Sequence, residues 1–267
     1  PLLEGTITMA LTPQAQETFT RLFGAPAAPH PTDPELYEIL QNQIFDEVFS
    51  TGVLTDVERE IITVTALGCL QTLPQLRAHA AAALNVGATP LQLREALYQC
   101  APYIGYPRTL NAVATLDDVL TQRGVELPLP TAATVAPDDA QARHRAGAAI
   151  QEPLYGDEIE EVLATLPAPF DAVAPELVTT ACFGDYYSRG VLSVAEREII
   201  SLVAITAIGA TAQFGTHIAG AVRAGNSLER VTAALVQALP YVGGPQVLPA
   251  LVIVAGYDEA ASHEAYR

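Results

Sequence analysis

A glutamate and a histidine recur at the same spacing in two separate parts of the chain. Glu60 is followed by His79, and Glu198 is followed by His217 after the same interval. A histidine titrates near neutral pH, and a nearby carboxylate can fix its tautomer or share its proton. The two pairs therefore predict two sites of proton transfer, each with its histidine as acid or base. One histidine and one glutamate per copy are too few ligands for a metal site, so we expect no metal and no other cofactor.

Four further side chains are candidates for binding a small-molecule substrate beside these pairs. Gln75 and Gln213 each stand one helical turn before the histidine, on the same helix face. Tyr103 and Tyr241 each stand in a P-Y-x-G-x-P turn, where a hydroxyl can donate a hydrogen bond. Gln75 and Tyr103 are expected to serve the first pair. The alternative is that the tyrosines only pack a tight chain reversal.

A structural interpretation of the two glutamates also stays open. Their i+4 and i+7 neighbours are apolar, so each glutamate begins an apolar line along its helix. A carboxylate that faces a core needs a partner, and that partner is either the histidine or an arginine, Arg59 or Arg197, of the neighbouring copy. Glu58 and Glu196 are different, because each stands three residues after a Thr or Ser in a capping box and is expected to cap a helix.

The two pairs belong to a longer internal duplication that predicts the fold. Sliding the chain by 138 residues, the interval from His79 to His217, aligns the surrounding residues without a gap. Each copy shows helix caps and apolar helical segments, and no comparably clear alternating strand pattern. We therefore expect an all-α fold of two tandem helical modules that form a pseudo-two-fold unit around one merged core. The modules are expected at residues 1–124 and 143–267, with a Pro-, Ala- and Thr-rich linker at 125–142.

The composition excludes several classes of protein. The formal net charge of −17 disfavours nucleic acid and anionic membranes as partners, and no apolar stretch is long enough to cross a bilayer. All 13 basic residues are arginines, which excludes Schiff-base lysine enzymes and P-loop nucleotide sites. The cysteines, Cys69, Cys100 and Cys182, form no C-x-x-C pair and are typical of a cytoplasmic protein with reduced thiols.

Several motifs of the first copy resemble the carboxymuconolactone decarboxylase family, which shares an all-helical fold with the alkylhydroperoxidase D-type proteins. The similarity lies in "LTDVEREIITVTAL", in an H-x4-LNVG-x-T-P segment that begins at His79, and in a Q-x3-Y-x-G-Y-P turn. It covers about residues 35–116 and, more loosely, 176–254. The resemblance implies two fused alkylhydroperoxidase D-like modules. It also implies a homo-oligomer in which three chains form the equivalent of a hexamer of single modules.

The resemblance separates two branches of this superfamily. Peroxidase members carry a C-x-x-C motif, whose positions fall here on Thr72 and Gln75 and on Ala210 and Gln213. Without a thiolate there is neither a peroxide nucleophile nor a resolving thiol. The missing cysteines therefore point to the decarboxylase branch.

Three functions follow from these observations. The first is a cofactor-free lyase that uses glutamate and histidine for proton transfer on a small lactone or carboxylate. In it the second pocket is either a second site or vestigial. The second function is a non-catalytic helical scaffold or small-molecule-binding protein. A weaker alternative is antioxidant activity of the alkylhydroperoxidase or peroxiredoxin type through Cys69 or Cys100.

Overall fold

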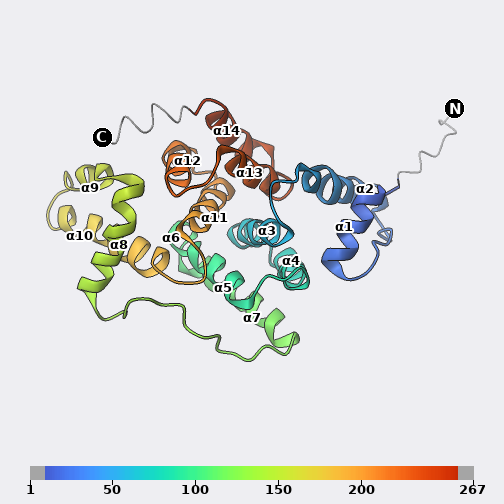
Figure 1. Ribbon diagram of the computed structural model, residues 1–267, viewed down its shortest axis with the longest axis horizontal. Helices are drawn as coiled ribbons and strands as arrows, with labels where there is room; N and C mark the ends of the chain where they lie inside the picture. The colour runs from blue at the N-terminus through green and yellow to red at the C-terminus, as the bar shows by residue number, and fades with distance from the viewer. Residues whose placement is uncertain (1–9, 258–267) are drawn as a thin grey trace.

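The computed structural model describes residues 10–257, and over this range it contains helices and no strand (Figure 1). The helices of the first copy are α1 (Pro13–Phe23), α2 (Pro34–Asn42), η1 (Gln43–Val48), η2 (Phe49–Thr51), α3 (Asp56–Leu70), α4 (Leu73–Asn85), α5 (Pro90–Gln99), α6 (Ala101–Ile104) and α7 (Tyr106–Gln122). The helices of the second copy are α8 (Ala140–Tyr155), α9 (Glu158–Leu163), α10 (Phe170–Leu177), η3 (Val178–Tyr187), α11 (Val194–Ala207), η4 (Thr211–Gln213), α12 (Phe214–Arg223), α13 (Leu228–Val242) and α14 (Gly244–Ala255). The predicted all-α fold of two tandem modules is confirmed.

Local sequence determines where the central helices begin. The hydroxyl of Thr55 accepts the amide of Glu58, whose carboxylate accepts the amide of Thr55 in return, so a capping box starts α3. Ser193 and Glu196 form the same box at the start of α11. The carboxylate of Glu58 also lies 2.7 Å from Arg230. The first glutamate of each E-R-E stretch is therefore a helix cap, as predicted.

One helical segment is irregular. It begins at Pro34 as the α-helix α2, changes to a π-helix at η1 and ends as a 3-10 helix at η2. The matching segment of the second copy is the longer π-helix η3. π-helical turns are rare and often lie at functional sites. Sequence periodicity did not indicate either of them.

Buried apolar side chains of both modules form one continuous cluster, as expected for a merged core. Helices α3 and α11 pack against each other within it. Ile61 and Ile62 line a small gap between these helices together with their counterparts, Ile199 and Ile200. The two copies therefore face each other around a pseudo-two-fold relation.

Matching polar contacts also cross the boundary between the modules. The buried guanidinium of Arg59 donates to the Gln237 side chain at 2.9 Å, and that of Arg197 donates to Gln99 at 3.1 Å. Gln237 and Gln99 are themselves counterparts in the repeat. A buried polar group is costly unless it is hydrogen-bonded, so each module depends on the other to satisfy its arginine.

The first helices of the two modules lie at opposite ends of the molecule, α1 and α2 at one end and α8 to α10 at the other (Figure 1). Residues 123–139 contain no helix and run along the surface between α7 and α8. Arg94 donates to the carbonyl oxygens of Leu129 and Pro130 at 3.2 and 2.8 Å, and the amide of Gly190 donates to Ala132 at 2.9 Å. Both modules thus hold this segment in place.

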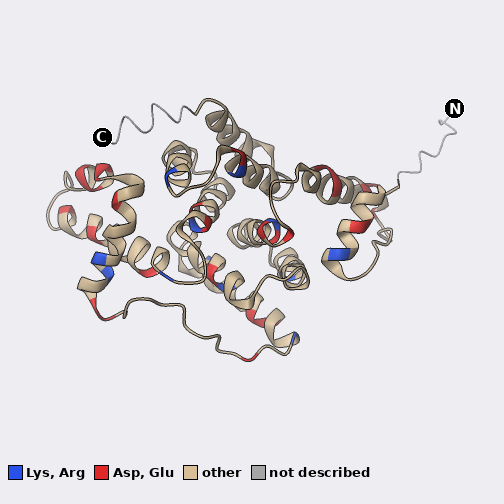
Figure 2. Cartoon of the chain, in the orientation of Figure 1, with Lys and Arg blue, Asp and Glu red and all other residues tan. Residues whose placement is uncertain are grey.

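Acidic residues are spread over helices of both modules and are not confined to one part of the chain (Figure 2). The arrangement gives phosphate groups no favourable field, in line with the net charge of −17. Among the described helices, none combines the length and the apolar character that a membrane span requires.

Candidate functional site

The first Glu–His pair is in direct contact. Helix α3 presents Glu60 and helix α4 presents His79, and the histidine Nδ1 lies 2.9 Å from the Glu60 Oε2. Glu60 is fully buried, and its second carboxylate oxygen has no hydrogen-bond partner. Burial strengthens this contact, because few water molecules compete for either group.

Two aromatic rings enclose the histidine of the first pair. Phe23, the last residue of α1, and Tyr241 of the second module lie edge-on to the His79 ring, with centroid distances of 5.6 and 5.3 Å. Burial raises the pKa of the Tyr241 hydroxyl, and the charge of Glu60 raises it further. The first histidine is thus held between helix α1 of its own module and the end of helix α13 of the other.

The second pair is built differently, because a tyrosine stands between its two members. The Tyr155 hydroxyl donates to the Glu198 Oε2 at 2.6 Å and lies 3.0 Å from the His217 Nδ1. The histidine and the carboxylate are 3.8 Å apart, beyond hydrogen-bonding distance. Tyr155 is the last residue of α8, outside the aligned repeat, and no sequence pattern had indicated it.

Tyr103 lies in the second site and not in the first, which corrects its predicted place. Its ring is edge-on to His217 with a centroid distance of 5.7 Å. Its hydroxyl is 3.1 Å from that of Tyr187, which is in turn 2.8 Å from Ser201 Oγ. The physical reason is the pseudo-two-fold packing of the modules. It places the short helix α6, which contains Tyr103, against α11 of the other module. Tyr241 reaches the first site in the same way.

The alternative in which an arginine neutralises the second glutamate of E-R-E is wrong. Glu60 contacts His79, and Glu198 accepts a hydrogen bond from Tyr155. Arg59 is hydrogen-bonded to carbonyl oxygens, a threonine and a glutamine, whereas Arg197 lies 3.3 Å from Glu95. Each arginine does reach the other module, but there it binds a glutamine, Gln237 or Gln99, and not the glutamate.

The two glutamines have different positions relative to their histidines. Gln75 lies in α4 one turn before His79, as predicted, but its side chain is exposed. Gln213 ends the short 3-10 helix η4 instead of sharing the helix face of His217 on α12. It nevertheless lines a cavity together with that histidine.

This cavity has a volume of about 470 Å³ and lies at the second site. The size suits a small molecule. Most of its wall is apolar or aromatic. The lining residues are Pro102, Tyr103, Gln151, Tyr155, Glu158, Ile159, Val162, Val178, Cys182, Phe183, Ala212, Gln213, Thr216 and His217. The lining has no arginine among these described residues.

The π-helix η3 brings Cys182 into the cavity wall. Burial raises the pKa of this thiol to about 12; the negative charge of Glu198 contributes, and a hydrogen bond with Tyr103 acts in the opposite direction. A thiol with so high a pKa is protonated at neutral pH and is a poor nucleophile. The other two cysteines, Cys69 and Cys100, are buried in the core. These environments do not favour the antioxidant alternative.

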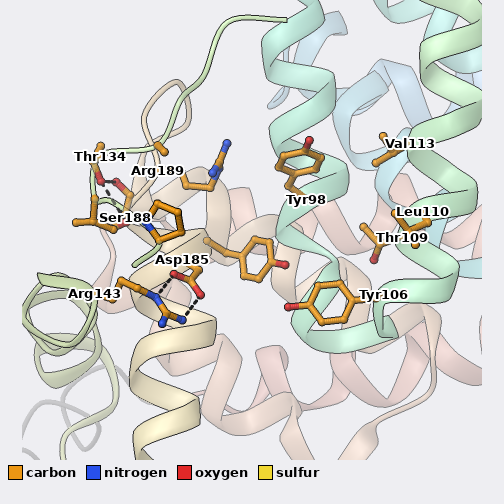
Figure 3. Close-up of a pocket in the computed structure, with 14 residues that line it drawn as sticks. Tyr98, Tyr106, Thr109, Leu110, Val113, Thr134, Arg143, Asp185, Ser188 and Arg189 are labelled. Atoms are coloured by element: carbon orange, nitrogen blue, oxygen red, sulfur yellow. Dashed lines mark hydrogen bonds and ion pairs between the residues drawn. The ribbon is translucent and has the colours of Figure 1, made fainter. Parts of the chain in front are cut away.

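A second cavity, of about 480 Å³, lies between α5, α7, η3 and the interhelical segment, residues 123–139 (Figure 3). Its arginines are already paired: Arg143 is hydrogen-bonded to both carboxylate oxygens of Asp185, and Arg189 contacts Glu95 at 2.8 Å. The view in Figure 3 shows tyrosine rings and hydroxyl groups around it, but none of the lining residues is a histidine. Of the two candidate histidines, His217 lies at the other cavity.

The sequence of the chain is similar to one known protein family. The family model described as the carboxymuconolactone decarboxylase family matches two regions of the chain, residues 34–118 and 172–255. These regions contain both Glu–His pairs and both tyrosine turns. They leave out α1 and α8, which supply Phe23 and Tyr155. A search of curated proteins finds no match.

Proposed function

Since the chain belongs to the carboxymuconolactone decarboxylase family, we propose that it is a cofactor-free lyase that transfers a proton on a small lactone. The working site of this proposal is the second one, made by Glu198, Tyr155 and His217. The observation that carries it is the cavity of about 470 Å³ that His217 lines. Two aromatic rings lie edge-on to each histidine, Phe23 and Tyr241 at His79 and Tyr103 and Tyr155 at His217, so the rings do not decide between the sites.

In the proposed reaction the bond between the lactone and its carboxylate breaks and CO₂ leaves. The bonding electrons pass into the conjugated ring system and towards its carbonyl oxygen, where hydrogen-bond donors stabilise the developing charge. Tyr103 and Gln213 line the cavity and are the proposed donors. His217 then delivers a proton to the carbon that has lost CO₂, and it is reprotonated from water.

The cavity lining restricts the charge of the substrate. It has no arginine, the chain has no lysine, and Glu158 adds a carboxylate to the wall. A carboxylate that stays on the product would be buried without a cation, which is costly. A carboxylate that is lost is different, because removal from water weakens its solvation in the ground state. We therefore propose a lactone with one carboxylate, the one that leaves.

The test compares three lactones with the purified chain: one with a single carboxylate, one with two, and a neutral unsaturated one. CO₂ release and uptake of solvent deuterium at carbon are followed. We expect turnover of the first in preference to the second. We expect His217→Gln to lower kcat/KM at least about a hundredfold and the matched variant His79→Gln to leave it within about threefold. Equal losses in both variants, or none in either, would contradict the choice of site.

A non-catalytic binding protein is the second candidate, and the same cavity supports it. In that case calorimetry detects binding of the lactone without release of CO₂. Replacement of His217 by Leu discriminates further, because a histidine that only packs the core can be exchanged for an apolar residue with a rise in melting temperature and no loss of any activity.

A further inference from the structure

The Tyr155 hydroxyl lies between the carboxylate and the histidine of the second site and contacts both. It is 2.6 Å from Glu198 and 3.0 Å from His217, and the two outer groups are 3.8 Å from each other. We propose that Tyr155 is a positioning residue that fixes the proton of neutral His217 on Nδ1 and connects that nitrogen to Glu198 for proton transfer. The proposed tautomer of His217 does not depend on which reaction the protein catalyses. The proposed proton transfer, in contrast, rests on the proposed function.

The tautomer follows from counting hydrogens. A hydroxyl carries one hydrogen, and an ionised carboxylate can only accept. The hydrogen of Tyr155 is used towards Glu198, so the tyrosine oxygen must accept from the histidine Nδ1–H. Neutral His217 then carries a lone pair on Nε2. Burial raises the pKa of the Tyr155 hydroxyl well above its usual value, with the charge of Glu198 as the next cause. The tyrosine therefore keeps its hydrogen.

The proton transfer is balanced along the same path. When Nε2 of His217 takes a proton, the Nδ1–H bond breaks and this hydrogen passes to the Tyr155 oxygen. The tyrosine O–H bond breaks at the same time, and its hydrogen forms a bond with Glu198. The products are a neutral carboxylic acid, an unchanged tyrosine and a neutral histidine protonated on Nε2. Because Glu198 is fully buried, this neutral set avoids a desolvated pair of charges. The reverse sequence supplies the proton to the substrate.

A glycine makes room for this tyrosine. A Cβ atom at Gly220 would lie 2.5 Å from the Tyr155 hydroxyl oxygen and 2.7 Å from the ring carbon that bears it, which is too close. The counterpart of Gly220 in the first copy is Ala82, which is buried in a cluster with Phe23 packed against it. The two modules thus differ in a matched way, with glycine and tyrosine in one and alanine and phenylalanine in the other.

The first site has no such bridge, because the carboxylate of Glu60 touches His79 directly at 2.9 Å. At the first site a proton can move only between His79 and Glu60 themselves, whereas at the second site the path includes the Tyr155 hydroxyl. Several titratable groups lie near His217 and belong to every element around it. They are Glu198 of α11, Tyr155 of α8, Tyr103 of α6, Cys182 of η3 and Glu158 of α9. Only Tyr155 and Glu198 form the path described above.

The test reads the protonation of each ring nitrogen by ¹⁵N NMR of the full chain labelled in histidine, without any substrate. We expect His217 to be protonated on Nδ1 at high pH, before the site has taken up a proton and while Glu198 is ionised. In Tyr155→Phe and in Gly220→Ala, which displaces the hydroxyl without removing it, we expect a mixture of tautomers. His79, observed in the same spectra, is the internal control. Tyr103→Phe is the matched control variant for Tyr155→Phe. Its ring also faces His217, but its hydroxyl is bound to Tyr187, so the tautomer should not change.

Two results would overturn the proposal. One is a wild-type His217 that is protonated on Nε2 even at high pH, where Glu198 is ionised. The other is a His217 that stays fully protonated on Nδ1 in folded Tyr155→Phe, because Glu198 alone would then be sufficient. Once a substrate is known, Tyr155→Phe should lower kcat about tenfold to a hundredfold with KM nearly unchanged. If the tautomer is as stated and no lactone is turned over, the proposed function fails and the role of Tyr155 in setting the tautomer remains.

Discussion

Tyr103 and His217 belong to different modules, yet their rings meet edge-on with a centroid distance of 5.7 Å. Tyr241 and His79 repeat this relation in the opposite direction at 5.3 Å. Each site is therefore composite, with its Glu–His pair from one module and its tyrosine from the other. The duplication does more than double a site, because neither module contains all the residues that surround its own histidine.

The composite geometry predicts different effects for the two tyrosines. Tyr103→Phe removes a hydroxyl at the cavity, and we expect kcat/KM for the proposed substrate to fall about tenfold, the equivalent of one hydrogen bond. The matched variant Tyr241→Phe should change it by less than about twofold, because that tyrosine lies at the first site. Steady-state kinetics of both variants check this, with thermal melts to confirm folding. A larger loss in Tyr241→Phe would place the working site at His79 instead.

The sequence predicted what depends on local contacts. Capping boxes involve residues three apart, so the starts of α3, α5 and α11 could be identified from the hydroxyl and the carboxylate or amide alone. The convergence of Glu60 with His79 also followed from the repeat, because two neighbouring helices carry them.

Other features depend on packing across long separations, and no spacing in the chain indicates them. The exchange of Tyr103 and Tyr241 between sites results from the pseudo-two-fold relation of the modules. Tyr155 lies on a helix outside the aligned repeat, and its role depends on a close approach that Gly220 permits. An isolated tyrosine and an isolated glycine carry no signal of this relation until the helices are placed in space.

The inter-module contact of Arg59 should be important for stability. Its guanidinium is buried and binds Gln237 and the carbonyl oxygens of Val48 and Phe49. Arg59→Met leaves these acceptors unsatisfied, so we expect the free energy of unfolding to fall by about 3 kcal/mol. In a double-mutant cycle with Gln237→Leu, the two losses should be coupled by about 1 kcal/mol. Urea unfolding measures both quantities.

The matched control for that cycle is Arg77→Met. Arg77 also contacts a carboxylate, Asp118, but both side chains are largely exposed. Exposed ion pairs contribute little, so its unfolding free energy should stay within about 0.5 kcal/mol of wild type. Additive losses for Arg59 and Gln237 would show that their contact does not link the modules energetically.

Cys182 should be almost unreactive although it lines the cavity. With its pKa raised to about 12 by burial, about one thiol in 10⁴ is ionised at pH 8. Alkylation by iodoacetamide at that pH should be about a thousandfold slower than for a free cysteine and should accelerate as the pH rises. Mass spectrometry locates the modified residue, and Cys182→Ser provides the control. Rapid alkylation of Cys182 at pH 8, or its oxidation by dilute peroxide, would favour the antioxidant alternative.

Glu95 should make stability depend on pH in the acid range. This fully buried carboxylate of the first module contacts Arg189 at 2.8 Å and Arg197 at 3.3 Å, both in the second. Burial by itself raises the pKa of Glu95, but the hydrogen bonds and charges of the two arginines outweigh it, so the pKa is lowered on folding. For a lowered pKa, the stabilisation is present above the unfolded value of about 4.3 and is lost as the pH falls through the folded value.

Glu95→Gln keeps the shape of the side chain and removes its charge, leaving two buried arginines without a counter-ion. We expect its unfolding free energy at pH 7 to be about 3 kcal/mol lower than that of wild type. The two proteins should converge as the pH falls from about 4.3 through the lower folded value, because Glu95 takes up a proton first in the unfolded chain and then in the folded one. Urea unfolding between pH 3 and pH 7 measures the difference, with Glu126→Gln on the exposed interhelical segment as control. A difference that stays constant over this range would show that the charge of Glu95 does not hold the modules together.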